Sequence, residues 1–293
     1  MEKVWRWVKP FVEIFMTVCI ISLLVALATS IPFFRSLQGF YLFLEKLIQI
    51  ANGFLHMDTL TVQIGESRTE HFLYIISEYY PYSLIILFSA FCVSFFIAAS
   101  LSYIYFILPK KIKKWISSLL FFIQSIPDVV FIFAIQLSII WIFKQTGWLI
   151  IDPIAGMDKV YVLPILTLSI LPSIFLFQTM ILAVSEEYKK PYVELARAKG
   201  LSKHHIWFHH LFRNVVVHVV SNMQYYFWFM LSNLLVLEFL FNMRGFMAFL
   251  RMQLHQADIV AISLTFLFLP FYLIDWLSKR VVFIMTGEKD VSG

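Results

Sequence analysis

Six long apolar runs dominate the pattern of hydrophobic and polar positions along the chain. A hydrocarbon core about 30 Å thick requires roughly 20 apolar residues in a helix that crosses it. The pattern therefore predicts an all-α polytopic membrane protein with six transmembrane helices. Their approximate ranges are 11–31, 83–108, 117–143, 160–184, 215–241 and 259–285.

A seventh candidate helix runs from Gly39 to Met57, between the first two apolar runs. Its apolar residues recur at the spacing of one helix face, but Glu45, Lys46 and Gln49 stand in its middle. This pattern favours an amphipathic surface helix over a further span. We expect it to belong to a long external segment, residues 32–82.

Composition agrees with this pattern. The chain has 293 residues, of which 60% are hydrophobic and 14% charged, whereas a soluble domain keeps about a quarter of its residues charged. The formal charge of +5 comes from short basic clusters between apolar runs, which indicates membrane topology and argues against binding of nucleic acid. We interpret residues 1–293 as a single transmembrane domain. No Gly-rich phosphate-binding loop is present in the sequence, so we expect neither enzymatic activity nor a bound cofactor in this chain.

The distribution of Lys and Arg predicts the orientation. If the N-terminus is cytoplasmic, 16 of the 23 basic residues fall in cytoplasmic segments and seven in external ones. The basic cluster from Lys110 to Lys114 contrasts with the external segment, which carries five acidic residues. We therefore expect a multi-pass protein of the cell membrane with both termini in the cytoplasm.

The longest cytoplasmic loop, residues 185–214, carries signals for two short helices. Pro191 suits the first turn of a helix, and Tyr192, Leu195, Ala196 and Lys199 would then share one face. Gly200 stands where a helix would end in the left-handed conformation. Ser202 is placed to be the N-cap of a second helix that continues through Arg213 into the fifth span.

This loop resembles the coupling loop of ABC importer permeases. Glu194-Leu195-Ala196-Arg197-Ala198-Lys199-Gly200 is similar to their Glu-Ala-Ala…Gly motif, with Glu and Gly six residues apart and Leu195 in place of the first Ala. Tyr192-Val193, Leu201, His210 and Arg213-Asn214 resemble the dipeptide, oligopeptide and nickel group of that family. The segment Ser125-Ile126-Pro127-Asp128 is similar to another element of the same group.

The resemblance implies a function and a set of partners. The chain would be one permease subunit of an importer for peptides or for nickel or metal chelates. It would pair with a second, similar permease, two cytoplasmic ATPases that bind ATP and Mg²⁺, and an external substrate-binding protein. The residues implied in coupling to the ATPase are Tyr192, Glu194, Ala196, Arg197, Ala198, Gly200, Leu201, Ser202, His210, Arg213 and Asn214.

Polar residues inside the spans are candidates for the transport pathway, because ionised groups at membrane depth are costly unless they are paired or face water. Asp128 follows a helix-breaking proline, and Gln124 lies one turn earlier on the same face. A gating role for Asp128 and a structural hydrogen bond remain alternatives. Glu238 and Asp275 lie near helix ends, from which side chains can reach the membrane surface. The pathway or gate candidates are Gln124, Asp128, Asn222, Tyr226 and Asn233.

Two alternative interpretations concern metal binding and the energy source. His205 and His209 are one turn apart within a histidine cluster, but no Cys or carboxylate is near them in sequence, so we predict no metal site. An ion-coupled secondary transporter is the alternative function. It would require its own ion site and often shows internal repeats or broken helices, and this sequence shows no convincing repeat.

Overall fold

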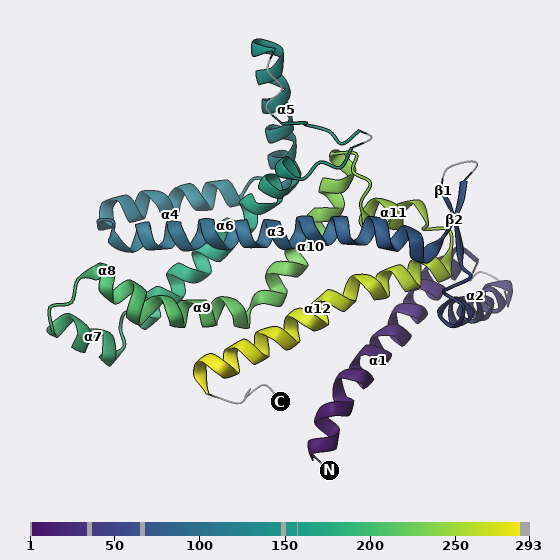
Figure 1. The fold of residues 1–293 in the computed structure, drawn as a ribbon, viewed down its shortest axis with the longest axis horizontal. Helices are drawn as coiled ribbons and strands as arrows, with labels where there is room; N and C mark the ends of the chain where they lie inside the picture. Colours follow the sequence, from purple (N-terminus) through teal and green to yellow (C-terminus); the bar gives the residue numbers. More distant parts are fainter. Residues whose placement is uncertain (1, 34–36, 65–67, 148–150, 157, 288–293) are drawn as a thin grey trace. The chain divides into compact units, whose positions relative to one another are not determined.

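A computed structural model describes residues 2–33, 37–64, 68–147, 151–156 and 158–287, and within them the chain is almost entirely helical (Figure 1). The helices are α1 (Glu2–Ser30), α2 (Leu37–Leu55), α3 (Phe72–Ile107), α4 (Lys110–Gln124), α5 (Asp128–Thr146), α6 (Val162–Glu187), α7 (Pro191–Ala198), α8 (Lys203–Ile206), α9 (Phe212–Ser221), α10 (Met223–Leu240), α11 (Phe246–Met252) and α12 (Ala257–Thr286). A 3-10 turn, η1 (Ile31–Phe33), follows α1, and a π-helical turn, η2 (Trp207–Leu211), precedes α9. A two-stranded antiparallel hairpin, β1 (Thr61–Ile64) and β2 (Arg68–His71), leads into α3.

Five stretches of the described residues are helical, long and apolar enough to cross a membrane: Phe11–Phe33, Phe72–Ile107, Asp128–Thr146, Val162–Glu187 and Ala257–Thr286. Large apolar side chains on these helices are exposed, as lipid contact requires: Phe96 is 69% exposed and Leu182 is 64% exposed. The prediction of an all-α polytopic membrane protein is confirmed. The count of six spans is not.

The prediction of one span over residues 117–143 is wrong. The helix ends at Gln124, and α5 begins at Asp128 after an extended Pro127 with φ −58° and ψ 142°. Proline lacks the amide N–H that a continuing helix needs, and it disfavours helical geometry in the residue before it. The apolar pattern continues through this break, so hydrophobicity alone could not reveal it.

The predicted fifth span, residues 215–241, is also divided. Asn222 (φ −107°, ψ 11°) separates α9 from α10, and its amide donates to the His218 carbonyl 2.9 Å away. Asparagine competes for backbone hydrogen bonds in this way and thereby interrupts helices. Gln224, Asn233 and Glu238 lower the hydropathy of α10, which is why it does not stand among the five apolar helices.

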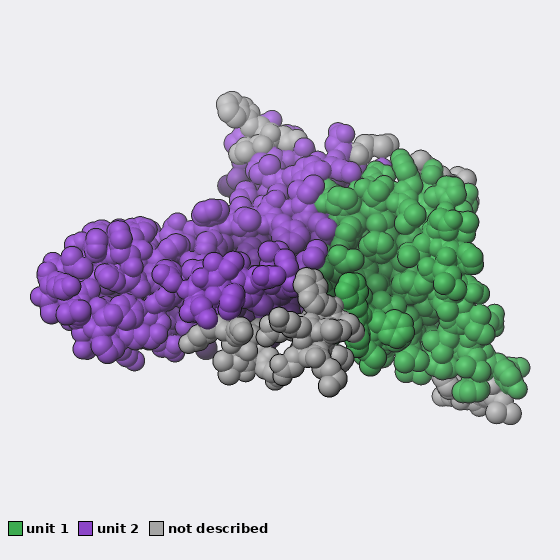
Figure 2. All heavy atoms as spheres, turned by 60° about the horizontal axis from the view of Figure 1, so that its bottom comes forward, with its two compact units in different colours: residues 1–82, 245–272 green, residues 83–244, 273–293 purple. Residues whose placement is uncertain are grey.

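The described chain divides into two compact units, coloured separately in Figure 2. Unit 1 holds residues 1–82 and 245–272, and unit 2 holds residues 83–244 and 273–293. Helices α3 and α12 each contribute residues to both units. The prediction of a single domain over residues 1–293 therefore stays a prediction.

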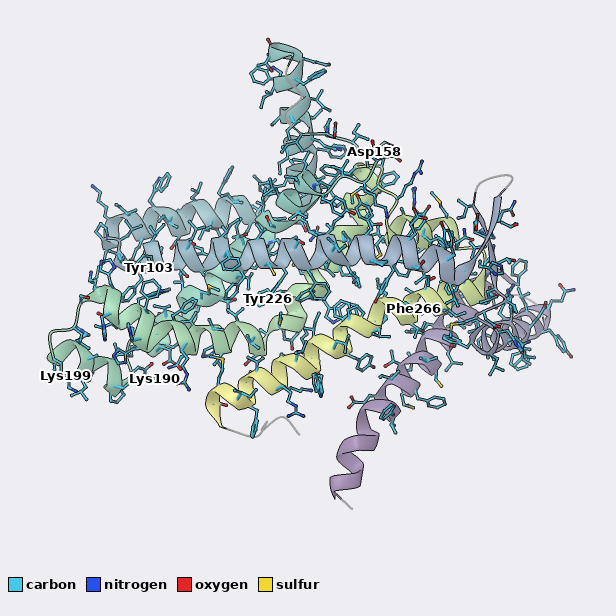
Figure 3. The ribbon with its side chains drawn as sticks, in the orientation of Figure 1. Tyr103, Asp158, Lys190, Lys199, Tyr226 and Phe266 are labelled. Atoms are coloured by element: carbon cyan, nitrogen blue, oxygen red, sulfur yellow. The ribbon has the colours of Figure 1, made fainter. Side chains whose placement is uncertain are left out.

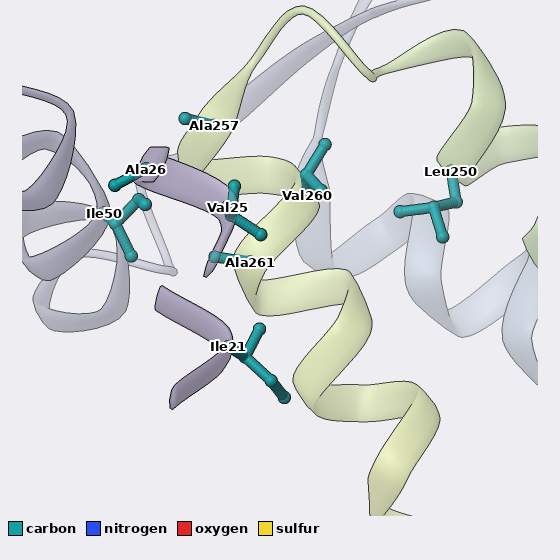
Figure 4. Close-up of a cluster of buried hydrophobic side chains, with 8 residues drawn as sticks. All are labelled: Ile21, Val25, Ala26, Ile50, Leu250, Ala257, Val260 and Ala261. Carbon is teal, nitrogen blue, oxygen red and sulfur yellow. The ribbon is translucent and has the colours of Figure 1, made fainter. Parts of the chain in front are cut away.

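Unit 1 is built on apolar packing. In Figure 4, Val25 and Ala26 of α1 lie close to Ile50 of α2 and Ala261 of α12. A second cluster joins Val62 of the hairpin to buried residues of α3, α11 and α12. The predicted amphipathic helix is present as α2. The sequence analysis did not predict the hairpin, because each strand has only four residues and carries little periodicity.

Unit 2 contains residues 185–214, the loop predicted to be cytoplasmic, and the helices around it. Helix α6 packs against α9 and α10, and α5 packs against α6 and α10. Glu238 is 1% exposed and accepts a hydrogen bond from Ser83. The expectation that Glu238 reaches the membrane surface is therefore wrong, whereas Asp275 is partly exposed and pairs with Lys279 at 2.7 Å.

Candidate functional site: the α7–α8 loop

The first short helix of the loop is confirmed at both ends. Helix α7 begins with Pro191 and ends before Gly200, which has a φ of +74°. The Gly200 amide donates to the Arg197 carbonyl at 2.9 Å, and the Leu201 amide donates to the Ala196 carbonyl at 3.2 Å. This pair of bonds is a Schellman motif, which ends a helix at a left-handed residue and sets the direction of the chain beyond it. Figure 3 labels Lys190 and Lys199 at the two ends of α7.

The second helix begins as predicted. Ser202 is its N-cap, and the Ser202 hydroxyl accepts from the His205 amide at 3.3 Å. After one turn of α8 the chain widens into the π-helical turn η2, and α9 follows directly. Such π turns often occur at functional sites. The sequence pattern predicts a regular helix here, so the π-helical turn is a difference from that prediction.

Helix α7 buries two residues. Val193 and Ala196 are buried, with exposed fractions of 0% and 4%, whereas Leu195, which helical spacing places on the same face as Ala196, is 58% exposed. The outward face of α7 instead presents Leu195 between the exposed side chains Glu194 and Arg197. This face combines an apolar side chain with one charge of each sign.

A buried carboxylate at the end of α6 holds the base of the loop. Glu187 is 3% exposed and accepts hydrogen bonds from Lys190 and from the Tyr192 hydroxyl. Asn214 donates to Glu187 Oε2 at 3.0 Å and to the Tyr192 hydroxyl oxygen at 3.0 Å. These four residues, the Glu187 network, connect the end of α6, the start of α7 and the start of α9.

Electrostatics fix the proton positions in the Glu187 network. Burial, followed by the hydrogen bond to Glu187, raises the pKa of Tyr192 to about 12. The phenol therefore stays protonated at neutral pH and keeps donating to the carboxylate. Sequence reasoning found Tyr192 and Asn214 but missed Glu187. An acidic residue at the end of a long apolar run was the available signal.

Arg213 and Asn214 are adjacent in sequence but bind different elements. Asn214 belongs to the Glu187 network, and Arg213 Nη2 donates to the Met285 carbonyl at 2.6 Å. Met285 lies in the last turn of α12, where carbonyl groups lack helical donors and a cation is favoured. Both contacts lie within unit 2. The predicted pair therefore anchors α9 to two neighbouring segments.

The histidines of the loop pack as rings. His205 stacks on His209 with centroids 4.1 Å apart, and His210 lies 6.2 Å from the Tyr192 ring. His204 hydrogen-bonds to Tyr103. Among the residues that the structure describes, no three His, Cys, Asp or Glu side chains gather as a metal site would require.

The structure brings together only two of the five pathway candidates. Asp128 and Asn233 line a cavity of about 10 Å³ near Pro172, which is large enough for about one water molecule. Buried Thr167 shares this cavity, and its hydroxyl has no hydrogen-bond partner among the described residues. A small polar cluster thus lies where α5, α6 and α10 meet.

The other three candidates lie elsewhere. Gln124 is separated from Asp128 by the break between α4 and α5, so the predicted shared helix face is wrong. The Tyr226 hydroxyl donates to the Thr179 hydroxyl at 2.7 Å. The side-chain amide of Asn222 donates to the carbonyl of His218, one helical turn earlier. Tyr226 and Asn233 belong to α10, whereas Asn222 lies at the break between α9 and α10.

Comparison with known proteins adds independent information. Residues 96–282 match the family described as "Binding-protein-dependent transport system inner membrane component". The peptide transport system permease protein SapB of Salmonella typhimurium is 32% identical over 102 residues, which are 35% of this chain and 32% of the relative. The Escherichia coli K12 protein named putrescine export system permease protein SapB is 30% identical over the same shares of both chains. The glutathione transport system permease protein GsiC of Escherichia coli O1:K1 is 32% identical over 116 residues, 39% of this chain and 37% of the relative. The matched segments thus span about a third of these relatives.

Proposed function

Because the chain belongs to the family of binding-protein-dependent transport system inner membrane components, we propose that it is a permease subunit of an ATP-driven importer. In this proposal the loop from α7 to α8 docks into a cytoplasmic ATPase and transmits its closure to the membrane helices. That movement gives alternating access to a path between two permeases.

The observation that carries the proposal is that the base of the loop is held by hydrogen bonds while the outward face of α7 is exposed. The Glu187 network ties the base of the loop to α6 and α9. The outward face leaves Glu194, Leu195 and Arg197 exposed. A coupling element must be stiff, because a loop that bends would absorb the movement instead of transmitting it.

The proposed partners follow from what the chain itself carries. ATP and Mg²⁺ belong to two ATPase subunits, each of which receives one coupling loop. A second, similar permease completes the transport path, and an external binding protein delivers the substrate. The apolar side chains exposed on the spanning helices offer surface for both lipid and the second permease.

The proposed orientation places the loop and both termini in the cytoplasm. To test it, Cys19 and Cys92 are replaced by serine, and one cysteine is introduced at Thr59 or at Ser202, both of which are exposed. A membrane-impermeant maleimide applied to intact cells should modify position 59 and leave position 202 unlabelled. Labelling of position 202 from outside would remove the basis of the coupling proposal.

The proposed cargo is a short peptide. Two of the three relatives described above are named for the transport of peptides or of glutathione and the third for putrescine export, and the loop resembles the peptide and nickel group. Nickel or a metal chelate, the other cargo implied by that resemblance, gains no support from these names. Uptake of labelled glutathione and of labelled tripeptides by cells with and without the transporter separates these cargoes.

The decisive experiment replaces Gly200 by valine. A residue with a Cβ in the left-handed region costs roughly 1–2 kcal/mol, and a β-branched residue fits it least well. Gly147 is a matched control, because it also ends a helix with a left-handed φ of +70° and also has open space around it. Gly200→Val should lose ATPase association and transport, whereas Gly147→Val should keep the ATPase bound.

Both variants should reach the membrane at near wild-type levels, because the local strain is the same and is small beside the folding energy of the whole bundle. ATPase retention on the affinity-purified permease is the measurement. Wild-type retention and transport in Gly200→Val would mean that the loop is an ordinary solvated connection. Equal loss in both variants would attribute the defect to strain alone.

A further inference from the structure

Unit 2 contains a cavity of about 320 Å³ next to the coupling loop. It lies where the C-terminal part of α3 and the end of α6 meet the first turns of α4 and α8. The site assigned to ATPase coupling does not include it. Three lysines from three different segments, Lys113, Lys189 and Lys203, line it together with Tyr and apolar side chains.

The lysines give the cavity an uncompensated positive charge. No Asp or Glu is among the described residues that line it, and none of the three lysines pairs with a carboxylate within the described chain. Lys113 is half-buried, and its ammonium donates to the Phe106 carbonyl at 3.1 Å. Burial, followed by the charge of Lys203, lowers the pKa of Lys113. An anion between these ammonium groups would relieve their mutual repulsion.

Apart from Ser102 and Ser185, the remaining lining is apolar and aromatic. It includes Tyr105, Ile181 and Val184, and the Lys113 ammonium lies 5.2 Å from the centre of the Tyr105 ring. These residues stand on the last turns of the membrane helices α3 and α6. Basic side chains above an apolar wall at a helix end are typical of sites that hold lipid head groups.

We propose that this cavity binds the phosphate of an anionic phospholipid, with its acyl chain along the apolar wall. Lys113, Lys189 and Lys203 contact the phosphate, and Tyr105 and Val184 contact the first part of the chain. The inference rests on the proposed function in one respect only: the orientation proposed there places the lipid in the cytoplasmic leaflet. Bound lipid would connect α4, α6 and α8 and thereby steady the coupling loop from the membrane side.

The test measures association of spin-labelled phosphatidylglycerol with the full-length protein in phosphatidylcholine vesicles, with spin-labelled phosphatidylcholine as the reference lipid. Each lysine near an anionic group contributes a factor of roughly five in affinity. The double variant Lys113→Gln/Lys203→Gln should therefore lower the preference for phosphatidylglycerol by up to about 25-fold. Lys110→Gln/Lys111→Gln is the matched control, because it removes the same charge from exposed positions of α4 outside the cavity.

Inorganic phosphate and water-soluble glycerophosphoglycerol, added at millimolar concentration, distinguish a free phosphate from a lipid. Neither should displace the spin-labelled lipid, because neither contacts the apolar wall. The proposal is overturned if the wild type shows no preference for phosphatidylglycerol, if both double variants lose it equally, or if inorganic phosphate displaces the lipid. The measurement needs no ATPase, so a failure of the coupling proposal leaves its outcome unchanged.

Discussion

Two regions of the molecule, one in each unit, are held in place by different kinds of interaction. In unit 1, α1, α2, the hairpin and α11 are joined by two clusters of buried aliphatic and aromatic side chains. In unit 2, the base of the α7–α8 loop is joined to α6 and α9 through a carboxylate and its three donors. One region is fixed by apolar contact area and the other by directed hydrogen bonds.

This difference has a physical reason. Apolar packing is strong but non-directional, and it tolerates small rearrangements. A buried hydrogen-bonded carboxylate is satisfied in one arrangement only, because an unpaired donor or acceptor in that place is costly. A loop that transmits movement therefore benefits from a polar base.

The largest expected effect comes from Glu187→Ala. This change removes the acceptor of Lys190, Tyr192 and Asn214 together, and breaking such a buried arrangement costs about 3 kcal/mol. Thermal unfolding of the purified protein should shift to lower temperature. ATPase retention should fall even at temperatures where the variant stays folded, because α7 is no longer held in one orientation relative to α6 and α9.

Glu186→Ala is the control for this change, because it removes an exposed carboxylate one position away on the same helix. It should leave both measurements near wild type. If Glu187→Ala lowers stability while ATPase retention stays at the wild-type level, the Glu187 network is structural and does not orient the loop.

The part of this comparison that the sequence predicts well is local backbone geometry. Pro191, Gly200 and Ser202 each restrict the backbone or satisfy helix-end groups within a few residues, so their roles are visible without the fold. The apolar runs indicated the membrane class for the same reason. Structure that depends only on residues close together in the sequence can be predicted from a single sequence.

Interactions between distant segments were not predictable in this way. Glu187 meets Asn214 across 27 positions, and no local pattern specifies that pairing. Helical spacing groups Leu195 with Ala196, but tertiary packing buries Val193 and Ala196 and leaves Leu195 exposed. Hydrophobicity continues through Pro127 and Asn222, so the apolar pattern alone did not divide the predicted spans there.

A second prediction tests the apolar side of the comparison with Gly53→Leu. A Cβ on Gly53 would lie 2.9 Å from Asp258 Cβ and 3.4 Å from Ile262 Cδ1. Overpacking of this kind costs about 1–3 kcal/mol, so thermal stability should fall while ATPase retention by the folded fraction stays unchanged. Gly156→Leu is the control, since a Cβ there meets open space. Loss of ATPase retention in Gly53→Leu would show that apolar packing in unit 1 also governs coupling.

The smallest and most selective effect is expected from two matched removals of one hydroxyl. In unit 1, the Tyr80 hydroxyl donates at 2.8 Å to the Phe266 carbonyl, which lacks its helical donor because the residue four positions on is Pro270. Tyr80→Phe leaves that carbonyl without this hydrogen bond, at a cost of about 1–2 kcal/mol, and should lower thermal stability only.

Tyr192→Phe removes a donor from the Glu187 network, but Glu187 keeps the hydrogen bonds from Lys190 and Asn214. Stability should therefore fall by about 1 kcal/mol or less. ATPase retention should nevertheless weaken, because the hydroxyl links α7 to Glu187 and helps to orient the loop. Each kcal/mol lost from the free energy of ATPase binding lowers the affinity roughly fivefold. Both quantities are measured on both variants. Tyr80→Phe should lower the melting temperature and leave ATPase retention unchanged, whereas Tyr192→Phe should mainly weaken ATPase retention. Equal retention in the two variants would mean that the hydroxyl of Tyr192 stabilises the fold as Tyr80 does and has no separate part in coupling.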